Sequence, residues 1–274
     1  MGVIVVGVDE SASARAALRW AVDQGRRRRW TVRAVLAWSY LDQHDDRGEG
    51  SFRPDYTEQD AVDVLDRLVD EAAAGDAIER IVTCDLPARA LLEASRAADL
   101  LVLGARSRGG TRSGWASVGQ RCALRAVVPV TIVRPTGSAV GVTRVVVGVD
   151  GSDHSVLALR WGLEEARLRG AGVTVAYAHP RSRSVPGRES RLAGRTVEAM
   201  LEECDTSGLV GRVDTAVAER DGLRALVAAS SETSLIVVGS DRSRGGLAGR
   251  LIRQADSAAA SSVVVVPSAS RSVH

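Results

Sequence analysis

The chain has 274 residues, enough for two domains of ordinary size. Its 36 basic and 34 acidic residues leave a formal net charge of only +2, which argues against nucleic acid or an anionic membrane as a partner. All 36 basic residues are arginine, which excludes chemistry that requires a lysine amine, such as Schiff-base catalysis. The longest apolar runs, such as 262–267, are far shorter than a membrane-spanning helix, which needs about 20 residues.

The first half of the chain predicts alternating strands and helices. Short runs rich in β-branched residues are typical of strands buried on both faces of a parallel sheet, and they occupy 3–8, 31–36, 78–83, 100–103 and 130–133. Segments with apolar residues at helical spacing separate these runs. Ser11 is placed to cap the first helix, Thr57 precedes a second at 58–74, and Pro87 suits the first turn of a third. Five strands with four crossover helices predict a doubly wound α/β domain.

The second half repeats the first. The sequence VVGVD at 5–9 returns at 146–150, and ALRW at 17–20 returns at 158–161, both 141 residues later. A repeat of half the chain indicates a duplicated domain, so we predict domains at 1–135 and 144–268. A linker containing Gly and Ser, at 136–143, joins them, and a tail follows at 269–274.

Cysteine and tryptophan positions add two expectations. Cys84, Cys122 and Cys204 match no metal-binding spacing and predict reduced thiols in a cytoplasmic protein. Trp20 and Trp161 occupy equivalent positions in the two halves and predict packing anchors.

Three motifs together resemble those of the universal stress protein family. They are Val-Gly-Val-Asp followed by Ser and Ala-Leu-Arg-Trp, the loop Gly-Ala-Arg-Ser-Arg-Gly-Gly at 104–110, and Pro-Val-Thr-Ile-Val-Arg-Pro at 129–135. The opening motif occurs twice, each time with a distal loop, so the resemblance covers nearly the whole chain. It implies a flavodoxin-like, adenine nucleotide hydrolase-like fold in each half. It also implies binding of ATP or AMP, with Mg²⁺ expected alongside ATP, and a role in stress adaptation without dedicated catalysis.

The resemblance implies a nucleotide site at the carboxyl ends of the strands. In the first half, the acid that contacts the nucleoside maps to Asp9, between Val8 and Ser11, and the main chain that contacts adenine maps to Ala37. The phosphate loop, in which glycine lets the main chain approach the ligand, maps to Leu103, Gly104, Ser107, Ala116, Ser117 and Val118. The corresponding second site comprises Asp150, Ser152, Ala178, Gly239 and Ser240.

Both phosphate loops depart from the family's pattern of Gly-x-x-Gly, a spacer and Gly-Ser. Ser107 and Ala116 replace glycines in the first half, and Arg253 and Gln254 replace Gly-Ser in the second. A non-glycine residue forced into a left-handed conformation costs about 1–2 kcal/mol. A lost hydrogen bond to a charged phosphate costs about 1.5–3 kcal/mol. We therefore expect the working site in the first half and a partner lobe in the second.

Two functions remain open on these residues. One is an adenine-nucleotide-binding stress regulator, and the other is an interaction or scaffold protein that uses the same fold without a nucleotide, which the degenerate loops favour. The segments after the second strands, at 39–60 and 179–195, form either lids over the sites or solvated loops.

The last strands predict an assembly. The apolar runs 130–133 and 263–266 would be exposed sheet edges unless something covers them. We predict that they pair within the chain as an internal pseudo-dimer. A homodimer of the whole chain is a further level of assembly that the sequence leaves open.

Overall fold

The computed structural model describes residues 1–38, 56–73, 75–105, 118–135, 141–178, 188–209, 212–218, 226–231, 233–240, 248, 251 and 261–268. The chain divides into two compact units, Met1–Pro135 and Thr136–Ser270. The predicted tail, and the linker up to residue 140, lie outside the described residues. Among the described helices, none has both the length and the apolar character needed to cross a bilayer.

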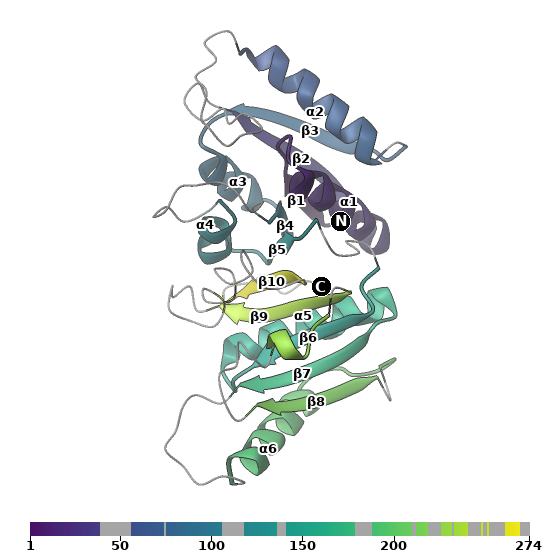
Figure 1. Cartoon of the computed structure of the whole chain (residues 1–274), viewed down its shortest axis with the longest axis vertical. Coiled ribbons are helices and arrows are strands. Elements are labelled where there is room, and N and C mark those ends of the chain that lie inside the picture. Colours follow the sequence, from purple (N-terminus) through teal and green to yellow (C-terminus); the bar gives the residue numbers. More distant parts are fainter. Residues whose placement is uncertain are drawn as a thin grey trace. The chain divides into compact units, whose positions relative to one another are not determined.

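The first unit alternates strands and helices as the sequence predicts. Its elements are β1 (Val3–Gly7), α1 (Ala12–Arg28), β2 (Thr31–Trp38), α2 (Glu58–Ala73), β3 (Ile78–Cys84), α3 (Pro87–Ser95), β4 (Leu100–Gly104), α4 (Val118–Arg125) and β5 (Val130–Val133). The strands are parallel, in the order β3-β2-β1-β4-β5 (Figure 1). From β1 the chain builds the sheet toward β3, then returns to build β4 and β5 on the other side. This doubly wound order confirms the predicted fold class.

The helices begin at the residues whose side chains can cap them. Ser11 Oγ accepts the N–H of Ala14 at 3.1 Å, which confirms Ser11 as the cap of α1. Thr57 Oγ1 accepts the N–H of Asp60 at 3.3 Å, and the Asp60 carboxylate accepts the Thr57 N–H at 2.7 Å, a reciprocal cap for α2. Pro87 opens α3, where its missing N–H costs nothing.

The sheet core of the first unit is apolar on both faces. Ile4, Val5 and Val6 of β1 are fully buried, and so is Trp20 of α1, as a packing anchor should be. Gly7 has a steric role here. A Cβ at this position would lie 2.8 Å from a Leu103 methyl carbon and 2.9 Å from one of Leu91, so the glycine makes room for α3 against β1.

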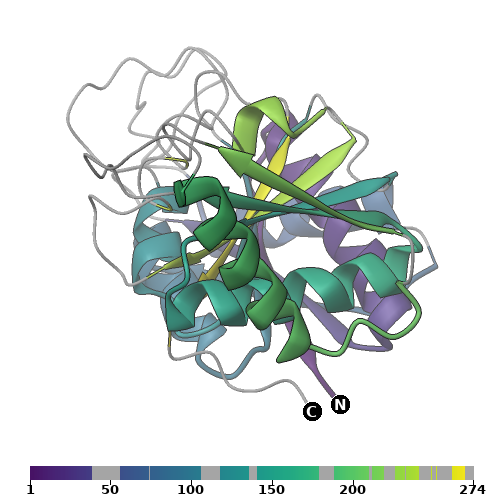
Figure 2. The same cartoon turned by 90° about the horizontal axis from the view of Figure 1, so that it is seen from below.

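The second unit has the same strand order. Its elements are β6 (Arg144–Val149), α5 (Asp153–Arg169), β7 (Gly172–Ala178), α6 (Arg188–Glu202), β8 (Val213–Ala218), β9 (Ser234–Ser240) and β10 (Ser262–Pro267). The parallel order β10-β9-β6-β7-β8 matches that of the first unit strand for strand. Helices α5 and α6 cover one face of this sheet (Figure 2), and Trp161 of α5 is 8% exposed. Ser152 caps α5 as Ser11 caps α1.

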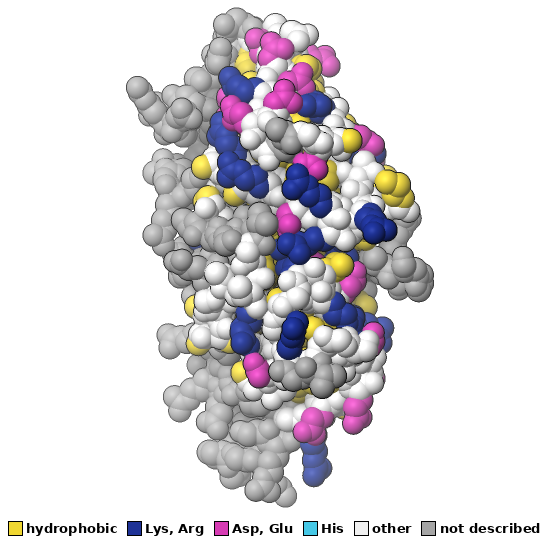
Figure 3. Space-filling view, turned by 90° about the vertical axis from the view of Figure 1, so that its right-hand side faces the viewer, with side chains coloured by type: hydrophobic (Ala, Val, Ile, Leu, Met, Phe, Trp, Pro, Cys, Tyr) yellow, Lys and Arg dark blue, Asp and Glu magenta, His cyan; other side chains and the backbone are white. Residues whose placement is uncertain are grey.

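Arginine and acidic side chains intermingle over the face shown in Figure 3. Arg33 pairs with Glu79 at 2.7 Å, and Arg26 pairs with Asp76 at 2.6 Å. Exposed pairs of this kind add about 0–1 kcal/mol each. They do, however, neutralise the cations locally, including part of the arginine run at 26–29.

Candidate functional site

The candidate site of the first unit lies at the carboxyl ends of β1 and β4. These two strands are neighbours in the sheet, although β2 and β3 come between them in the chain. The chain therefore leaves β1 and β4 in opposite directions, and this switch point is where open α/β sheets typically place a ligand-binding crevice. Val8, which is buried, and Asp9, which is exposed, follow β1 directly.

Asp9 is held at the start of α1. Its Oδ1 accepts the main-chain N–H of Ser11 at 2.9 Å, while Ser11 Oγ caps the helix. The carboxylate therefore stands beside the positive end of a 17-residue helix. A carboxylate oxygen offers several acceptor positions, so Asp9 can accept further hydrogen bonds from a ligand.

Ala37 presents its main chain toward the same crevice. Val8 N–H donates to Val35 O at 3.0 Å, so the main-chain groups of Val35 face β1. Main-chain groups alternate in direction along a parallel strand, so those of Ala37 also face the β1 side. Trp38 confirms the alternation, because its O accepts from Asp85 N–H, at 3.0 Å, next to β3. The ladder with β1 stops at Val35, so the Ala37 N–H and C=O point past the end of β1.

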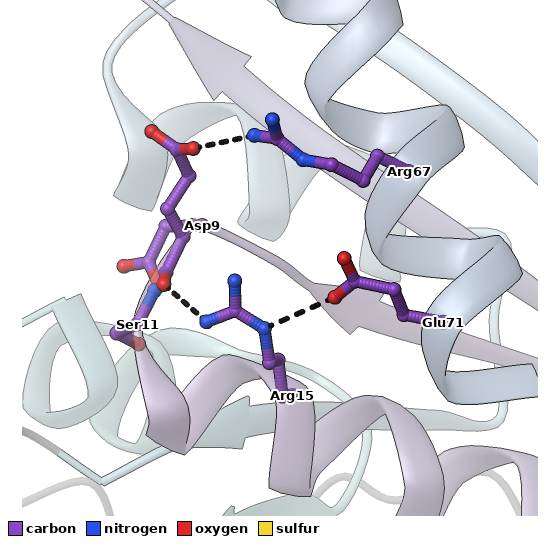
Figure 4. A network of polar contacts seen from close by, with 6 residues as sticks. Asp9, Ser11, Arg15, Arg67 and Glu71 are labelled. Atoms are coloured by element: carbon purple, nitrogen blue, oxygen red, sulfur yellow. Dashed lines mark hydrogen bonds and ion pairs between the residues drawn. The ribbon is translucent and has the colours of Figure 1, made fainter.

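A charged network surrounds the Asp9 turn (Figure 4). Arg67 of α2 donates to Glu10 Oε1 at 2.7 Å. Arg15 of α1 donates to the Glu10 main-chain O at 2.6 Å and lies 3.5 Å from Glu71 Oε2. These contacts tie the turn to α1 and α2. The sequence reasoning missed these four residues, because Glu10 and Arg67 are 57 positions apart and belong to no motif.

Gly104 has a packing role that the loop motif does not reveal. A Cβ there would lie 2.5 Å from the Ser13 carbonyl carbon, 2.7 Å from Ser13 O and 2.8 Å from Ala14 N. The end of β4 therefore touches the main chain of the first turn of α1. Gly104 is not among the described glycines with positive φ, so close approach, and not left-handed backbone, explains the glycine.

The other predicted residues of the first-unit phosphate loop are only partly described. Leu103 is buried in β4, and Val118 is the first residue of α4 and 38% exposed. Ser107, Ala116 and Ser117 lie outside the described residues.

In the equivalent turn of the second unit, the acid accepts two hydrogen bonds from a residue of its own turn. Asp150 Oδ1 accepts both the N–H and the Oγ–H of Ser152, at 3.0 and 2.6 Å. Gly151, at φ +84°, takes the place of Glu10. Ala178 ends β7, one residue past the last residue paired with β6.

The end of β9 completes this comparison. A Cβ at Gly239 would lie 2.5 Å from the His154 carbonyl carbon, so this glycine packs as Gly104 does. Ser240, the last residue of β9, is buried.

The described residues contain no group of three or more His, Cys, Asp or Glu side chains arranged to hold a metal ion. All three cysteines are free. Burial raises the pKa of the Cys122 thiol to about 12, and it also raises the pKa of Cys204. Cys84 is exposed.

These features define a class: a tandem α/β protein whose two units each carry an acid and a capped helix at the crevice edge. The chain belongs to the universal stress protein family, whose model matches residues 1–134 and 141–267. The tandem-domain identification is thereby confirmed.

Individual relatives agree. The universal stress protein Rv3134c of Mycobacterium tuberculosis is 29% identical over 238 residues, covering 86% of this chain and 88% of its own. Rv2623 of the same species is 37% identical over 135 residues, covering 48% and 44%. A solved universal stress protein from Archaeoglobus fulgidus matches 97% of this chain and 98% of its own, with a TM-score of 0.66 and 16% identity, which supports the fold.

Proposed function

We propose that the first unit binds an adenine nucleotide, ATP or AMP, and that the protein is a nucleotide-responsive stress regulator without dedicated catalysis. The observation that carries this proposal is that the Ala37 main chain and the Asp9 carboxylate lie at the same edge of the sheet. The N–H and C=O of Ala37 lie past the last residue of β2 that pairs with β1, at the edge where the Asp9 carboxylate also lies.

The chemistry of these groups fits the ligand. The Watson–Crick edge of adenine carries one acceptor, N1, beside one donor, the amino group, and the Ala37 N–H and C=O are complementary to that pair. The Asp9 carboxylate can accept from ribose hydroxyls. The positive end of α1 favours the anionic end of a nucleotide.

The first unit is the better candidate because its acid, Asp9, accepts fewer hydrogen bonds from its own turn than Asp150 does. Asp9 accepts one local N–H, from Ser11, whereas Asp150 accepts both the N–H and the hydroxyl of Ser152. A ligand hydroxyl that approaches Asp150 at Oδ1 competes with a 2.6 Å hydrogen bond of its own turn. The second unit, with its site residues Asp150, Ser152, Ala178, Gly239 and Ser240, then serves as a partner lobe.

Magnesium enters this proposal only with ATP. Mg²⁺ at nucleotide sites is typically coordinated by the substrate phosphates and by several waters, together with one or two carboxylates.

The scaffold alternative also has support. Gly104 and Gly239 are explained by contact with helix main chain, with no phosphate required. On this view the tandem domains pair as an internal pseudo-dimer, and the whole chain can associate as a homodimer. The three free cysteines fit a reducing compartment such as the cytoplasm under either function.

Calorimetric titration with ATP and AMP tests the proposal on three proteins: wild type, Asp9→Ala and Asp150→Ala. Both substitutions remove an acid that accepts the N–H two residues on, so they form a matched pair. We expect Asp9→Ala to weaken binding about 10-fold or more, the effect of losing hydrogen bonds to a charged group, and Asp150→Ala to leave it unchanged. No heat of binding with wild type at millimolar ATP would instead support the scaffold function.

A further inference from the structure

The turn that carries Asp9 is also held by an arginine that belongs to none of the sequence motifs. Arg15 of α1 donates through Nη1 to the main-chain O of Glu10 at 2.6 Å (Figure 4). The N–H of the same peptide group, that of Ser11, donates to Asp9 Oδ1 at 2.9 Å. Arg15 and the Asp9 carboxylate therefore bind opposite ends of one peptide group, which is planar and rigid.

This shared peptide group links Arg15 to the orientation of the carboxylate. The C=O and N–H of a trans peptide point in opposite directions, so turning the plane weakens both hydrogen bonds at once. Without the arginine, the hydrogen bond at the carbonyl end is lost and the plane is held less firmly. Asp9 is exposed, so water also competes for its oxygens. A ligand would then have to order the carboxylate as it binds, and that ordering lowers affinity.

The second unit holds its acid in another way. Val156 stands at the position of Arg15, 141 residues later, and a valine side chain donates no hydrogen bond. There the hydroxyl of Ser152 donates directly to Asp150 Oδ1 at 2.6 Å. An arginine at this helix position is therefore a feature of the first unit, the one proposed to bind the nucleotide.

The surroundings of Arg15 favour a role on the turn over a direct contact with phosphate. Its Nε lies 3.5 Å from Oε2 of Glu71 on α2. A phosphate that approached the guanidinium would meet this carboxylate, and like charges repel. Arg15 therefore suits the positioning of a neighbouring group better than the binding of an anion.

We infer that Arg15 is a positioning residue of the first-unit site, which acts through the Glu10–Ser11 peptide group to orient the Asp9 carboxylate for the ribose hydroxyls. This inference rests on the proposed function and adds to it a residue that does not touch the ligand. Asp9 acts on the nucleoside, which ATP, AMP and adenosine share. Arg15 therefore contributes equally to the binding of all three.

Titrations of ATP, AMP and adenosine into wild type, Arg15→Met and Arg26→Met test the inference. Arg26→Met is the charge-matched control, because Arg26 lies in the last turn of the same helix and pairs with Asp76 at 2.6 Å. We expect Arg15→Met to weaken all three ligands by the same factor, about 3- to 10-fold, the effect of one lost hydrogen bond at a partly exposed site. Arg26→Met should bind as wild type does. Both variants should unfold in urea as wild type does, because exposed ion pairs contribute little to stability.

A double-mutant cycle shows whether Arg15 acts through Asp9. The double variant Asp9→Ala/Arg15→Met should bind ATP no more weakly than Asp9→Ala alone, because Arg15 then has no carboxylate to orient. If the two losses multiply instead, Arg15 acts independently of Asp9 and the inference is wrong.

Three further outcomes separate the inference from the proposed function. If wild type binds ATP and Arg15→Met binds it equally well, the inference is wrong and the proposed function stands. A loss confined to ATP and AMP would also overturn the inference, because it would assign Arg15 to phosphate. If wild type binds no nucleotide, the proposed function fails and the inference fails with it.

Discussion

Replacing Gly104 with alanine separates the packing role of this glycine from a ligand-binding role. The new Cβ would meet main-chain atoms of Ser13 and Ala14 at 2.5–2.8 Å. Ordinary contact begins near about 3.5 Å, so the first turn of α1 must move by roughly 0.7–1 Å. Overpacking of this kind costs about 1–3 kcal/mol. Because the clash is with main chain, no side-chain rotation can relieve it.

The assay is urea unfolding without any nucleotide, monitored through tryptophan fluorescence. We expect Gly104→Ala, and its second-unit equivalent Gly239→Ala, to lower the free energy of unfolding by about 1–3 kcal/mol. Gly194→Ala in α6 is the control, because a Cβ there meets no atom within 4 Å and alanine favours a helix by about 0.5–1 kcal/mol. Wild-type stability for Gly104→Ala, with the control stabilised as expected, would refute the packing argument.

Three other predictions concern the caps of α1 and α5 and the cysteines. Arg29 ends α1 at φ 55°, and Gly170 ends α5 at φ 64°, so both caps have left-handed backbone, which favours glycine. Arg29→Gly should therefore raise the free energy of unfolding by about 1 kcal/mol, and Gly170→Ala should lower it by a similar amount. Thermal unfolding should show the midpoint rising for the first variant and falling for the second. Iodoacetamide at pH 8 should label Cys84 alone in the native protein. Burial raises the pKa of the Cys122 thiol to about 12 and also raises that of Cys204, so neither thiol reacts readily. If mass spectrometry finds Cys122 or Cys204 labelled as fast as Cys84, the burial of these thiols is contradicted. Because the Cys122 thiol ordinarily titrates near 9.0, its contribution to stability should fall as the pH rises from about 9 toward 12.

Local sequence patterns predicted the fold well. Runs of β-branched residues located the strands of the first unit to within two residues, and Ser11 marked the true start of α1. These features depend on neighbouring residues, so a single sequence contains them. The repeat at an offset of 141 residues then extended the same reading to the second unit.

The candidate site was less predictable, because its features depend on distant pairs. The direction of the Ala37 main chain follows from the register of β1 on β2, which no local pattern fixes. The partner of Gly104 is a helix turn some 90 positions earlier, so the sequence favoured a phosphate role and missed the packing role. The contact of Arg67 with Glu10 likewise joins two elements that become neighbours only in the folded unit.

The stoichiometry of ATP binding to the wild-type chain tests the central claim most directly. If the site fills in the cell, the purified protein should release ATP or AMP when it is denatured. In a separate experiment, calorimetric titration of folded protein from which nucleotide has been removed should give one nucleotide per chain. Two per chain would contradict the preference for the first unit. No released nucleotide and no heat at millimolar ATP would contradict nucleotide binding altogether.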